Sequence, residues 1–511
     1  IATCPLSVWL TWKNMRINFS RDIAHLLDLI RSECLPNQEL YIVGGALRDI
    51  LLGRDLHDLD FSMPDDPTNL ARTIAHKLKA GFFVLDDERH TARVLFRRRE
   101  NYIFPLDFVQ FTGGDLLSDL KYRDFTINAI AVSVFDLEKL IDPLGGIQDL
   151  ADGLLRTCSD HALLDDPLRV LRGIRLAMQF DFSYGPGVSQ LMTEASKNLP
   201  RTSYERQRDE FFKILEGPHP AEGMAHCRQF GVFETLVPPL MEQEDVPVSP
   251  PHTLGLFDHS LKVVENLAFL ISALEINHKN ESPDSWWFSE FCSQLGKFSE
   301  NITGYLAAEI TPGRSKKGLL LFAALLHDIG KPMTITVGED GYLHFYNHAR
   351  VGADLAWEAA KTLQLSNAES AWIRTIVENH MRLLPLVNRG QTPTRRDVYR
   401  FYQEAGERGM AIALLSLADT LATYNQNLSP EKWDHALMVS KVMLSAWVED
   451  QNSVVNPELL LDGDDLQVKF GMEPGKEIGK LLNKLREAQA SGDVETMAQA
   501  ETFILAQIKE N

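Results

Sequence analysis

One stretch, residues 40–62, restricts what this 511-residue chain can fold into more than any other. It opens with an apolar run of strand length, continues through Gly44 and Gly45, and enters a short amphipathic segment that predicts a helix. A second predicted strand then carries Asp58 and Asp60. Because side chains two apart on a strand point the same way, both carboxylates are expected on one side.

This arrangement indicates metal and phosphate chemistry. Two aimed carboxylates offer the hard oxygen ligands that suit Mg²⁺. Adjacent glycines let backbone N–H groups approach a phosphate, and the helix start behind them favours an anion. A plain strand–turn–helix whose aspartates cap or solvate a turn is the better interpretation of either motif alone. Both motifs at this spacing favour nucleotidyl or phosphoryl transfer.

The following segment supplies a third acidic residue. Asp107 alternates with apolar neighbours in a strand-like run and is expected beside Asp58 and Asp60, although an isolated aspartate there would be an exposed edge residue. The three arginines at 97–99 predict a solvated turn, with RNA phosphate contact as the alternative. Upstream, residues 17–35 predict a helix with one apolar face.

Two later motifs combine charge with helix signals. In the string 119–130, Arg123 and Asp124 can pair, and Asn128, expected within an apolar helix, needs a hydrogen-bond partner. In the string 165–175, Asp166 is expected to be the N-cap of a helix with Pro167 at its first position. Arginines at every third position of that helix share one broad face. They are Arg169, Arg172 and Arg175.

Together these strings resemble the polymerase-β-type nucleotidyltransferases, in the branch of bacterial tRNA nucleotidyltransferases (CCA-adding enzymes) and poly(A) polymerases. Tyr122 stands where the family usually has a first arginine, and Asp165 where it has glutamate. The resemblance implies that Asp58, Asp60 and Asp107 are catalytic and that Asp58 and Asp60 bind Mg²⁺. It implies nucleotide binding, with base selection by Asp166 and Arg169, for a larger set: Gly44, Gly45, Arg48, Arg123, Asp124, Asn128, Asp166, Arg169, Arg172 and Arg175.

Six residues farther on fall on apolar segments with a spacing of their own. They are His259, His327, Asp328, His348, His380 and Asp419. A carboxylate such as Asp419 within an apolar helix is costly unless it is paired or binds metal. Any one of these histidines alone would be a satisfied core residue. As a set they resemble the HD phosphohydrolases, which implies a divalent metal such as Ni²⁺, Mn²⁺, Fe²⁺ or Zn²⁺ and cleavage of phosphate esters.

Composition bounds the remaining questions. The length predicts several domains, and five cysteines without a C-x-x-C pair favour a reducing, cytoplasmic compartment. No apolar run reaches membrane-spanning length, so no membrane partner is expected. The net charge of −20 counts against bulk nucleic-acid binding but allows a basic groove.

We therefore expect an α+β fold: a nucleotidyltransferase head with a mixed sheet plus helices, followed by an all-α neck, HD body and tail. The predicted divisions are an N-terminal helical extension, the head, the neck, the HD domain with an insertion, and a tail with a tRNA contact. They fall at 1–37, 38–150, 151–235, 236–445 (insertion 274–318) and 446–511. Within the insertion, Trp286 and Trp287 are expected to be buried, with an interaction patch as the alternative.

The resemblance implies addition of CMP or AMP from CTP and ATP to the tRNA 3′ end, with the HD domain repairing 3′-phosphate ends. Only fifteen residues, 108–122, separate Asp107 from Arg123. Full CCA-adding enzymes have a longer flexible loop there, so we expect a CC-adding enzyme and a separate A-adding partner enzyme. The alternatives are a poly(A) polymerase or A-adding enzyme, an HD phosphohydrolase with an RNA-binding head, and a nucleotide-signalling hydrolase.

Overall fold

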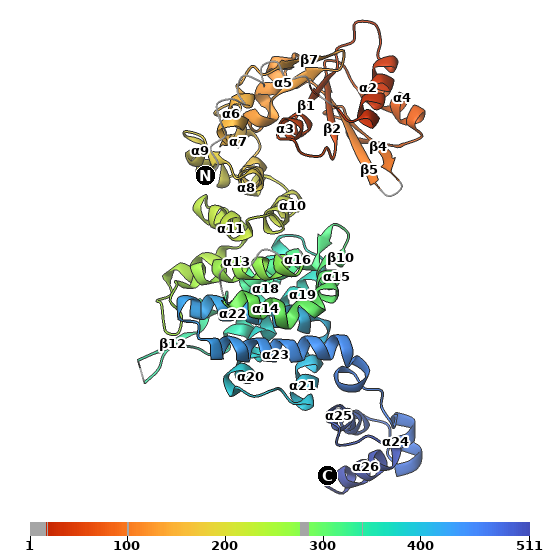
Figure 1. Cartoon of the computed structure of the whole chain (residues 1–511), viewed down its shortest axis with the longest axis vertical. Helices are drawn as coiled ribbons and strands as arrows, with labels where there is room; N and C mark the ends of the chain where they lie inside the picture. The colour runs from red at the N-terminus through yellow and green to blue at the C-terminus, as the bar shows by residue number, and fades with distance from the viewer. Residues whose placement is uncertain (1–16, 18, 100–101, 276–285, 340, 511) are drawn as a thin grey trace. The chain divides into compact units, whose positions relative to one another are not determined.

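The computed structural model describes residues 17, 19–99, 102–275, 286–339 and 341–510. Its internal contacts divide the chain into two compact units. One comprises Ile1–Glu210 with Gln229–Val232, and the other Phe211–Arg228 with Phe233–Asn511. The first unit contains a large sheet, and the second is mostly helical (Figure 1). The predicted α+β class is confirmed, while the finer division into five domains stays a prediction.

The first unit is built on a mixed seven-stranded sheet with the order β3-β4-β5-β2-β1-β6-β7. Only β2 and β5 pair in parallel; the other neighbours are antiparallel. The strands are β1 (Tyr41–Val43), β2 (Leu59–Met63), β3 (Gly81–Asp86), β4 (Thr91–Arg99), β5 (Tyr102–Gln110), β6 (Ala131–Ser133) and β7 (Asp136–Ile141). Alternate residues of β2, such as Leu59 and Phe61, are fully buried, as their apolar alternation predicts.

Helices cover this sheet and continue beyond it. Helix α2 buries the four apolar residues that the 17–35 pattern places on one face, so that prediction is confirmed. Helix α4 packs on β4, and α3 contacts β1 and β2. The helices are α2 (Arg21–Glu33), α3 (Gly45–Leu51), α4 (Thr68–Leu78), α5 (Leu116–Tyr122), α6 (Gly146–Asp152), α7 (Ala162–Asp165), α8 (Leu168–Phe180), α9 (Val188–Ser196) and α10 (Tyr204–Leu215), of which α10 runs into the second unit.

The second unit packs long apolar helices against one another. The main ones are α13 (Leu256–Glu275), α16 (Lys316–Leu326), α18 (His348–Thr362), α19 (Asn367–Asn379), α22 (Gly409–Tyr424) and α23 (Pro430–Glu449). Within the predicted insertion, α14 (Trp286–Leu295) packs on α23, and α15 (Ser299–Ala307) packs on α13 and α16. Beyond the large sheet the chain is not purely helical, because the described residues also form three two-stranded sheets.

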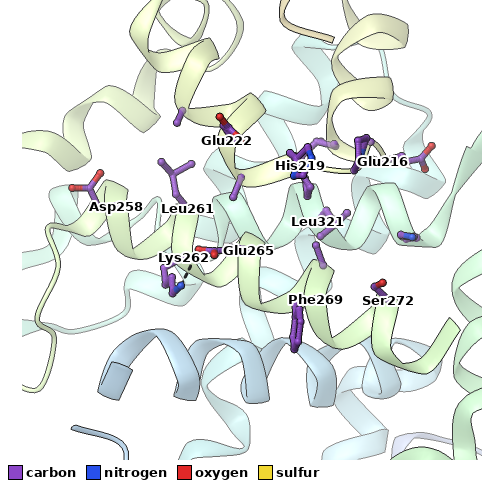
Figure 2. A pocket seen from close by; sticks show the side chains of 18 of the residues that line it. Glu216, His219, Glu222, Asp258, Leu261, Lys262, Glu265, Phe269, Ser272 and Leu321 are labelled. Atoms are coloured by element: carbon purple, nitrogen blue, oxygen red, sulfur yellow. Dashed lines mark hydrogen bonds and ion pairs between the residues drawn. The ribbon is translucent and has the colours of Figure 1, made fainter. Parts of the chain in front are cut away.

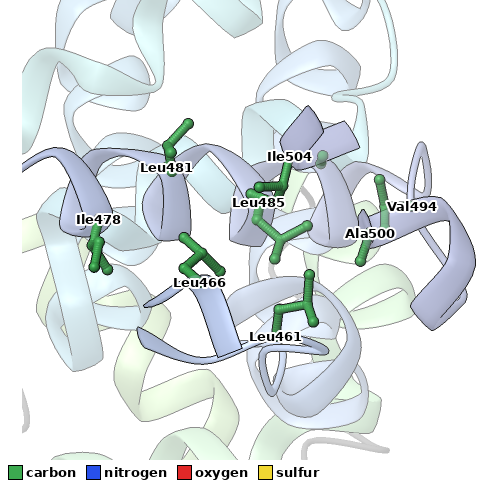
Figure 3. Packing of buried hydrophobic residues seen from close by; sticks show 9 residues of the cluster. Leu461, Leu466, Ile478, Leu481, Leu485, Val494, Ala500 and Ile504 are labelled. Atoms are coloured by element: carbon green, nitrogen blue, oxygen red, sulfur yellow. The ribbon is translucent and has the colours of Figure 1, made fainter. Parts of the chain in front are cut away.

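The tail forms a small hydrophobic core of its own. Helices α24 (Gly463–Phe470), α25 (Lys476–Ser491) and α26 (Met497–Glu510) enclose Leu466, Leu481, Leu485 and Ile504 (Figure 3). Helix α25 also packs against α21 (Arg395–Ala405), where the Arg400 Nη2 atom pairs with Glu487 at 2.7 Å.

Several local predictions were wrong. Asp58 precedes β2 rather than lying in it. Asn128 ends a 3₁₀ turn followed by strand β6, because a short buried apolar run does not distinguish a helix from a strand. Arg97 and Arg98 lie within β4, where Arg98 pairs with Asp22.

The remaining expectations concern exposure and compartment. Trp286 is 46% exposed, against the expected burial, whereas Trp287 packs edge-on against Trp433. Four cysteines carry free thiols, and Cys4 lies outside the described residues, as does most of the N-terminal extension before residue 17. Among the described residues, no helix combines the length and apolar character that crossing a membrane requires.

Candidate active site and metal centre

Strand pairing brings the three predicted catalytic carboxylates together. In the parallel pair β2–β5, Asp60 lies directly opposite Asp107, and Asp58 precedes Asp60 by two residues. Partners at one register position point to the same face of the sheet. Asp107 also accepts two 2.7 Å hydrogen bonds from Arg93 on β4, a residue that the sequence motifs did not indicate.

The glycine loop is packed against this group. Gly44 has φ +78°, a left-handed conformation that favours glycine, and it precedes α3. A Cβ atom on Gly44 would lie 2.8 Å from the Asp60 Oδ2 atom and 3.3 Å from the Arg123 Nη1 atom. The backbone therefore passes between a carboxylate and a guanidinium with no room for a side chain, as expected where a loop holds a phosphate next to a metal.

The carboxylates repel one another. Burial, followed by the charges of Asp58 and Asp107, raises the pKa of Asp60 from 3.8 to about 7. Burial and then the charge of Asp107 also raise the pKa of Asp58. Crowded carboxylates whose ionisation is suppressed have the electrostatics of a cation site. Their hard oxygen donors fit Mg²⁺.

A buried polar chain connects the second motif to α8. Arg48 donates to the Asn128 side chain at 2.6 Å, and Asn128 donates to Asp124 at 3.0 Å. Asp124 also accepts from Arg172 at 3.0 Å. Burial opposes its ionisation, but Arg172 and the hydrogen bond from Asn128 lower the pKa of Asp124 to about 2. Asn128 thus has the hydrogen-bond partners that the sequence predicts it needs.

Arg123 is held at the edge of the same site. Its Nη2 atom pairs with Asp119 at 3.0 Å, and Asp119 is itself buried and bonded to the Thr112 backbone N–H. This carboxylate anchors Arg123 beside Gly44, but no motif in the sequence singles it out.

The predicted base-selecting residues lie at the start of α8. Asp166 accepts from the backbone N–H of Leu168 at 3.2 Å and pairs with Arg206 at 3.0 Å, so it caps the helix one residue before the assigned N-cap, Pro167. Arg169 lies over the Tyr122 ring, 5.3 Å from its centroid, and donates to two backbone carbonyls.

The third arginine of this helix makes different contacts. Arg175 bonds Glu210 and Gln179 rather than the head motifs.

The second unit contains the other predicted cluster, and the structure brings all six residues together. Asp328 is at its centre: the Oδ2 atom lies 3.1 Å from His327 and 3.8 Å from His259, and the Oδ1 atom 3.4 Å from His348 and 3.6 Å from His380. Asp419 completes the set, 3.2 Å from the His259 Nε2 atom.

The histidines are oriented for metal binding. The Nδ1 atoms of His327, His348 and His380 lie 2.7–2.8 Å from backbone carbonyl oxygens, which leaves each Nε2 atom directed at the cluster. The buried Nε2 atoms of His259 and His327 lie 3.1–3.2 Å from carboxylate oxygens, but neither makes a hydrogen bond among the described residues. Imidazole nitrogens supported in this way, with two carboxylates, fit a divalent transition metal.

Two further residues join this cluster without having been predicted. Lys331 pairs with Asp328 at 2.6 Å and lies 3.5 Å from the His252 Nε2 atom. The His252 ring lies edge-on to His259, with 4.6 Å between centroids. Lys331 is three residues after Asp328 on the chain, a helical spacing that could have signalled it; His252 sits in a proline-rich loop that gives no such signal.

A separate cavity of about 770 Å³ lies between the segment 215–225, α13 and α16. Figure 2 shows acidic side chains around it, including Glu216, Glu222 and Asp258, with Lys262 paired to Glu265. Among the described residues, the closely spaced groups of three His, Asp, Glu or Cys side chains lie in the histidine cluster, and none lines this cavity.

Comparison with known proteins finds family matches in the regions that contain both groups of residues. The sequence matches the Poly A polymerase head domain over residues 40–156, the probable RNA- and SrmB-binding site of polymerase A over 181–243, and the HD domain over 298–419. An A-adding tRNA nucleotidyltransferase of Deinococcus radiodurans is 31% identical over 471 residues, 91% of this chain and 94% of the relative. A CC-adding tRNA nucleotidyltransferase of Geobacter sulfurreducens is 28% identical, covering 91% of both chains.

Solved structures show the same fold. The Thermotoga maritima CCA-adding enzyme complexed with tRNA aligns with a TM-score of 0.60 at 22% identity over 99% of both chains. A CCA-adding enzyme with CTP aligns with a TM-score of 0.63, also at 22% identity, over 96% of both chains. Fold and site thus define a nucleotidyltransferase joined to an HD domain. The chain belongs to the family of bacterial tRNA nucleotidyltransferases.

Proposed function

We propose that this enzyme adds nucleotides from CTP or ATP to the 3′ end of tRNA. The observation that carries the proposal is the register of β2 and β5, which sets Asp60 opposite Asp107 next to the Gly44 loop. The relatives, whose names all describe tRNA nucleotidyl addition, support it.

In this mechanism Asp58 and Asp60, with Asp107, would hold two Mg²⁺ ions, whose chemistry is to activate the RNA 3′-hydroxyl and neutralise the departing pyrophosphate. The backbone of Gly44 and Gly45 and the guanidinium of Arg123 bind the triphosphate.

The base is selected by α8. Asp166 accepts and Arg169 donates hydrogen bonds, which together suit the Watson–Crick edge of cytosine or adenine. The polar chain from Arg48 to Arg172 fixes this helix against the head through Asp124. Arg175, bonded to Glu210, contributes by holding α8 rather than by touching the nucleotide.

We further propose that the product ends in CC. The connection from β5 to Arg123 consists of a turn over 111–115 and helix α5, in which Asp119 holds Arg123. This is a short connection in place of a longer loop that would switch from CTP to ATP. The relatives include both A-adding and CC-adding enzymes, so their names leave the product open.

Incubating the purified protein with tRNA lacking its CCA end, plus CTP and ATP, tests both proposals. The expected product has two added C residues and no terminal A, and a separate A-adding enzyme completes it. A product ending in CCA, or a single A added only to tRNA that already ends in CC, contradicts CC specificity. A long A tract without use of CTP would identify a poly(A) polymerase.

For the second unit we propose a metal-dependent phosphohydrolase that repairs tRNA ends bearing a 3′-phosphate or cyclic phosphate. The buried group around Asp328, with histidines held by backbone carbonyls, supports metal binding. Release of phosphate from a 3′-phosphorylated minihelix, dependent on added Ni²⁺ or Mn²⁺, is the expected result. Hydrolysis of free cyclic nucleotides without any action on RNA would instead favour a signalling hydrolase.

A tRNA contact at the segment 474–479 of the tail also stays a prediction.

A further inference from the structure

Among the described residues, the sheet face that carries the three carboxylates is covered over β1 but not over its outer strands. Over β1, Val43 packs with Leu120 of α5 and with Ala129 and Ala131 in a closed core. Asp60 sits opposite Val43, at the edge of this covered part. Beyond it the same face continues over β5, β4 and β3.

One register position runs across the whole of this face. Val43 lies opposite Asp60, Asp60 opposite Asp107, Asp107 opposite Arg93, and Arg93 opposite Phe83. Cross-strand partners project to the same side of a sheet. Because neighbouring strands lie about 4.8 Å apart, Phe83 stands about 10 Å from Asp107 on the same face.

This outer part of the face is exposed although it is apolar. Phe83 is 52% exposed, and Ile103, four residues before Asp107 on β5, is 54% exposed. On the opposite face, Ala92 of β4 and Phe104 of β5 are fully buried, whereas Val84 of the edge strand β3 is 38% exposed. An aromatic ring left in solvent beside the carboxylates, on a sheet whose other face is packed over β4 and β5, is the arrangement of a binding surface.

We propose that the exposed face formed by Phe83, Arg93 and Ile103 binds the single-stranded 3′ end of the RNA substrate, with Phe83 stacking on a base upstream of the reacting 3′-hydroxyl. This inference rests on the proposed function. An RNA strand whose 3′ end reaches Asp60 must leave the site across a neighbouring surface, and this face is continuous with the carboxylates.

The side chains along the row match the parts of a nucleotide chain. The carboxylates would hold the metal ions at the reacting end. Arg93, with 39% of its side chain exposed, pairs with Asp107 and offers positive charge to the next phosphate. Phe83 then offers a flat apolar face to a base, and base–aromatic stacking tolerates any sequence. A protein partner would not require the charge of Arg93 at this point.

The test compares four variants on an RNA minihelix lacking its CCA end: Phe83→Ala, Phe83→Leu, Phe83→Tyr and, as a matched control, Phe135→Ala. Phe135 is 51% exposed in the turn between β6 and β7, at the other edge of the sheet. We expect Phe83→Ala and Phe83→Leu to raise the KM for RNA roughly 5- to 100-fold, as for one lost base–aromatic stack. Phe83→Tyr and Phe135→Ala should remain near the wild type, and the KM for CTP should not change.

A fluorescent base gives a second measurement. Its emission would not change if Phe83 only supported the fold. With 2-aminopurine in the single-stranded 3′ end, binding to the wild type and to Phe83→Tyr should quench the emission, and binding to Phe83→Ala should not. Equal KM values and equal quenching in wild type and Phe83→Ala would overturn the inference, as would a parallel rise in the KM for CTP. Failure of the wild-type enzyme to add nucleotides to the minihelix would instead overturn the proposed function.

Discussion

The two candidate metal sites of this chain are built in opposite ways. In the head, three carboxylates lie at the boundary between covered and open parts of a sheet, and burial, followed by repulsion from Asp58 and Asp107, raises the pKa of Asp60 to about 7. In the HD domain, four histidines and Asp328 are buried, and each of three histidines is fixed by a backbone carbonyl.

This difference separates their chemistry. An open carboxylate group suits Mg²⁺ that enters and leaves with the nucleotide and keeps part of its water shell. A closed group rich in imidazole suits a transition metal that is retained. The carboxylates of the head are therefore expected to be neutralised only when Mg²⁺ and nucleotide bind. The ligands of the HD group are already assembled in the folded protein.

The most severe test of this separation is Asp60→Ala. It should lower nucleotide addition by roughly 10³-fold or more, because the ion it would hold supplies several kcal/mol of charge stabilisation. Phosphohydrolase activity should not change. The exposed neighbour Asp55→Ala serves as the control in a CTP-incorporation assay. Loss of both activities in folded Asp60→Ala protein would refute independent sites.

The converse variant is Asp328→Ala. Since Asp328 faces all four histidines of the cluster, its removal should eliminate most bound transition metal and with it phosphate release. Nucleotide addition should stay within about twofold of the wild type, because no step in the head uses that metal. Metal analysis of the purified protein measures the first effect, and Asp354→Ala, in an exposed pair with Arg374, is the control. Retention of stoichiometric metal would contradict the assignment.

A smaller effect is expected at Tyr122, which supports Arg169. Loss of the cation–π contact in Tyr122→Ala should raise the KM for CTP about 2- to 30-fold and weaken discrimination against ATP. Tyr122→Phe keeps the ring and should behave as the wild type. Steady-state assays with each nucleotide decide this. An unchanged ratio of CTP to ATP use in Tyr122→Ala would show that the stack does not position the selecting arginine.

The smallest effect concerns pH. With a pKa raised from 3.8 to about 7, Asp60 holds a proton in the folded metal-free protein that the unfolded chain releases. The metal-free stability it contributes is therefore present below about pH 4 and is lost as the pH rises through about 7. Mg²⁺ binds the ionised form, so it should raise the Tm by more at pH 8 than at pH 5. In Asp60→Asn this difference should disappear, as thermal unfolding would show; an equal Mg²⁺ effect at both pH values would contradict the assignment.

The sequence motifs indicated residues that the structure brings together in two groups, because each residue belongs to a short string with its own spacing; their functional roles stay predictions. Their partners were not predictable in this way. Arg93 reaches Asp107 only through the antiparallel β4–β5 register, and Asp119 holds Arg123 one helical turn away without any motif. His252 precedes its cluster in an irregular loop, where no periodicity indicates which way a side chain points.

The predicted helix and strand boundaries were wrong where the local sequence signals were ambiguous. The segment around Asn128 is apolar enough for a helix, but tertiary packing makes it a 3₁₀ turn before a strand. Arg98 lies in a strand because its neighbours pair with β5, and its guanidinium then contacts Asp22, 76 residues away. Such long-range pairs decide structure that a sequence window does not contain.

The pair of buried Asp124 and half-exposed Arg172 also bears on how this protein can be divided. The region that matches the head family ends at residue 156, so it does not include Arg172. A head cut at that point would keep Asp124 buried without the guanidinium that neutralises it, at a cost of about 3–5 kcal/mol. The head is therefore not an independent domain when it is cut at this point. A fusion protein that contains the head has to include α8 as well.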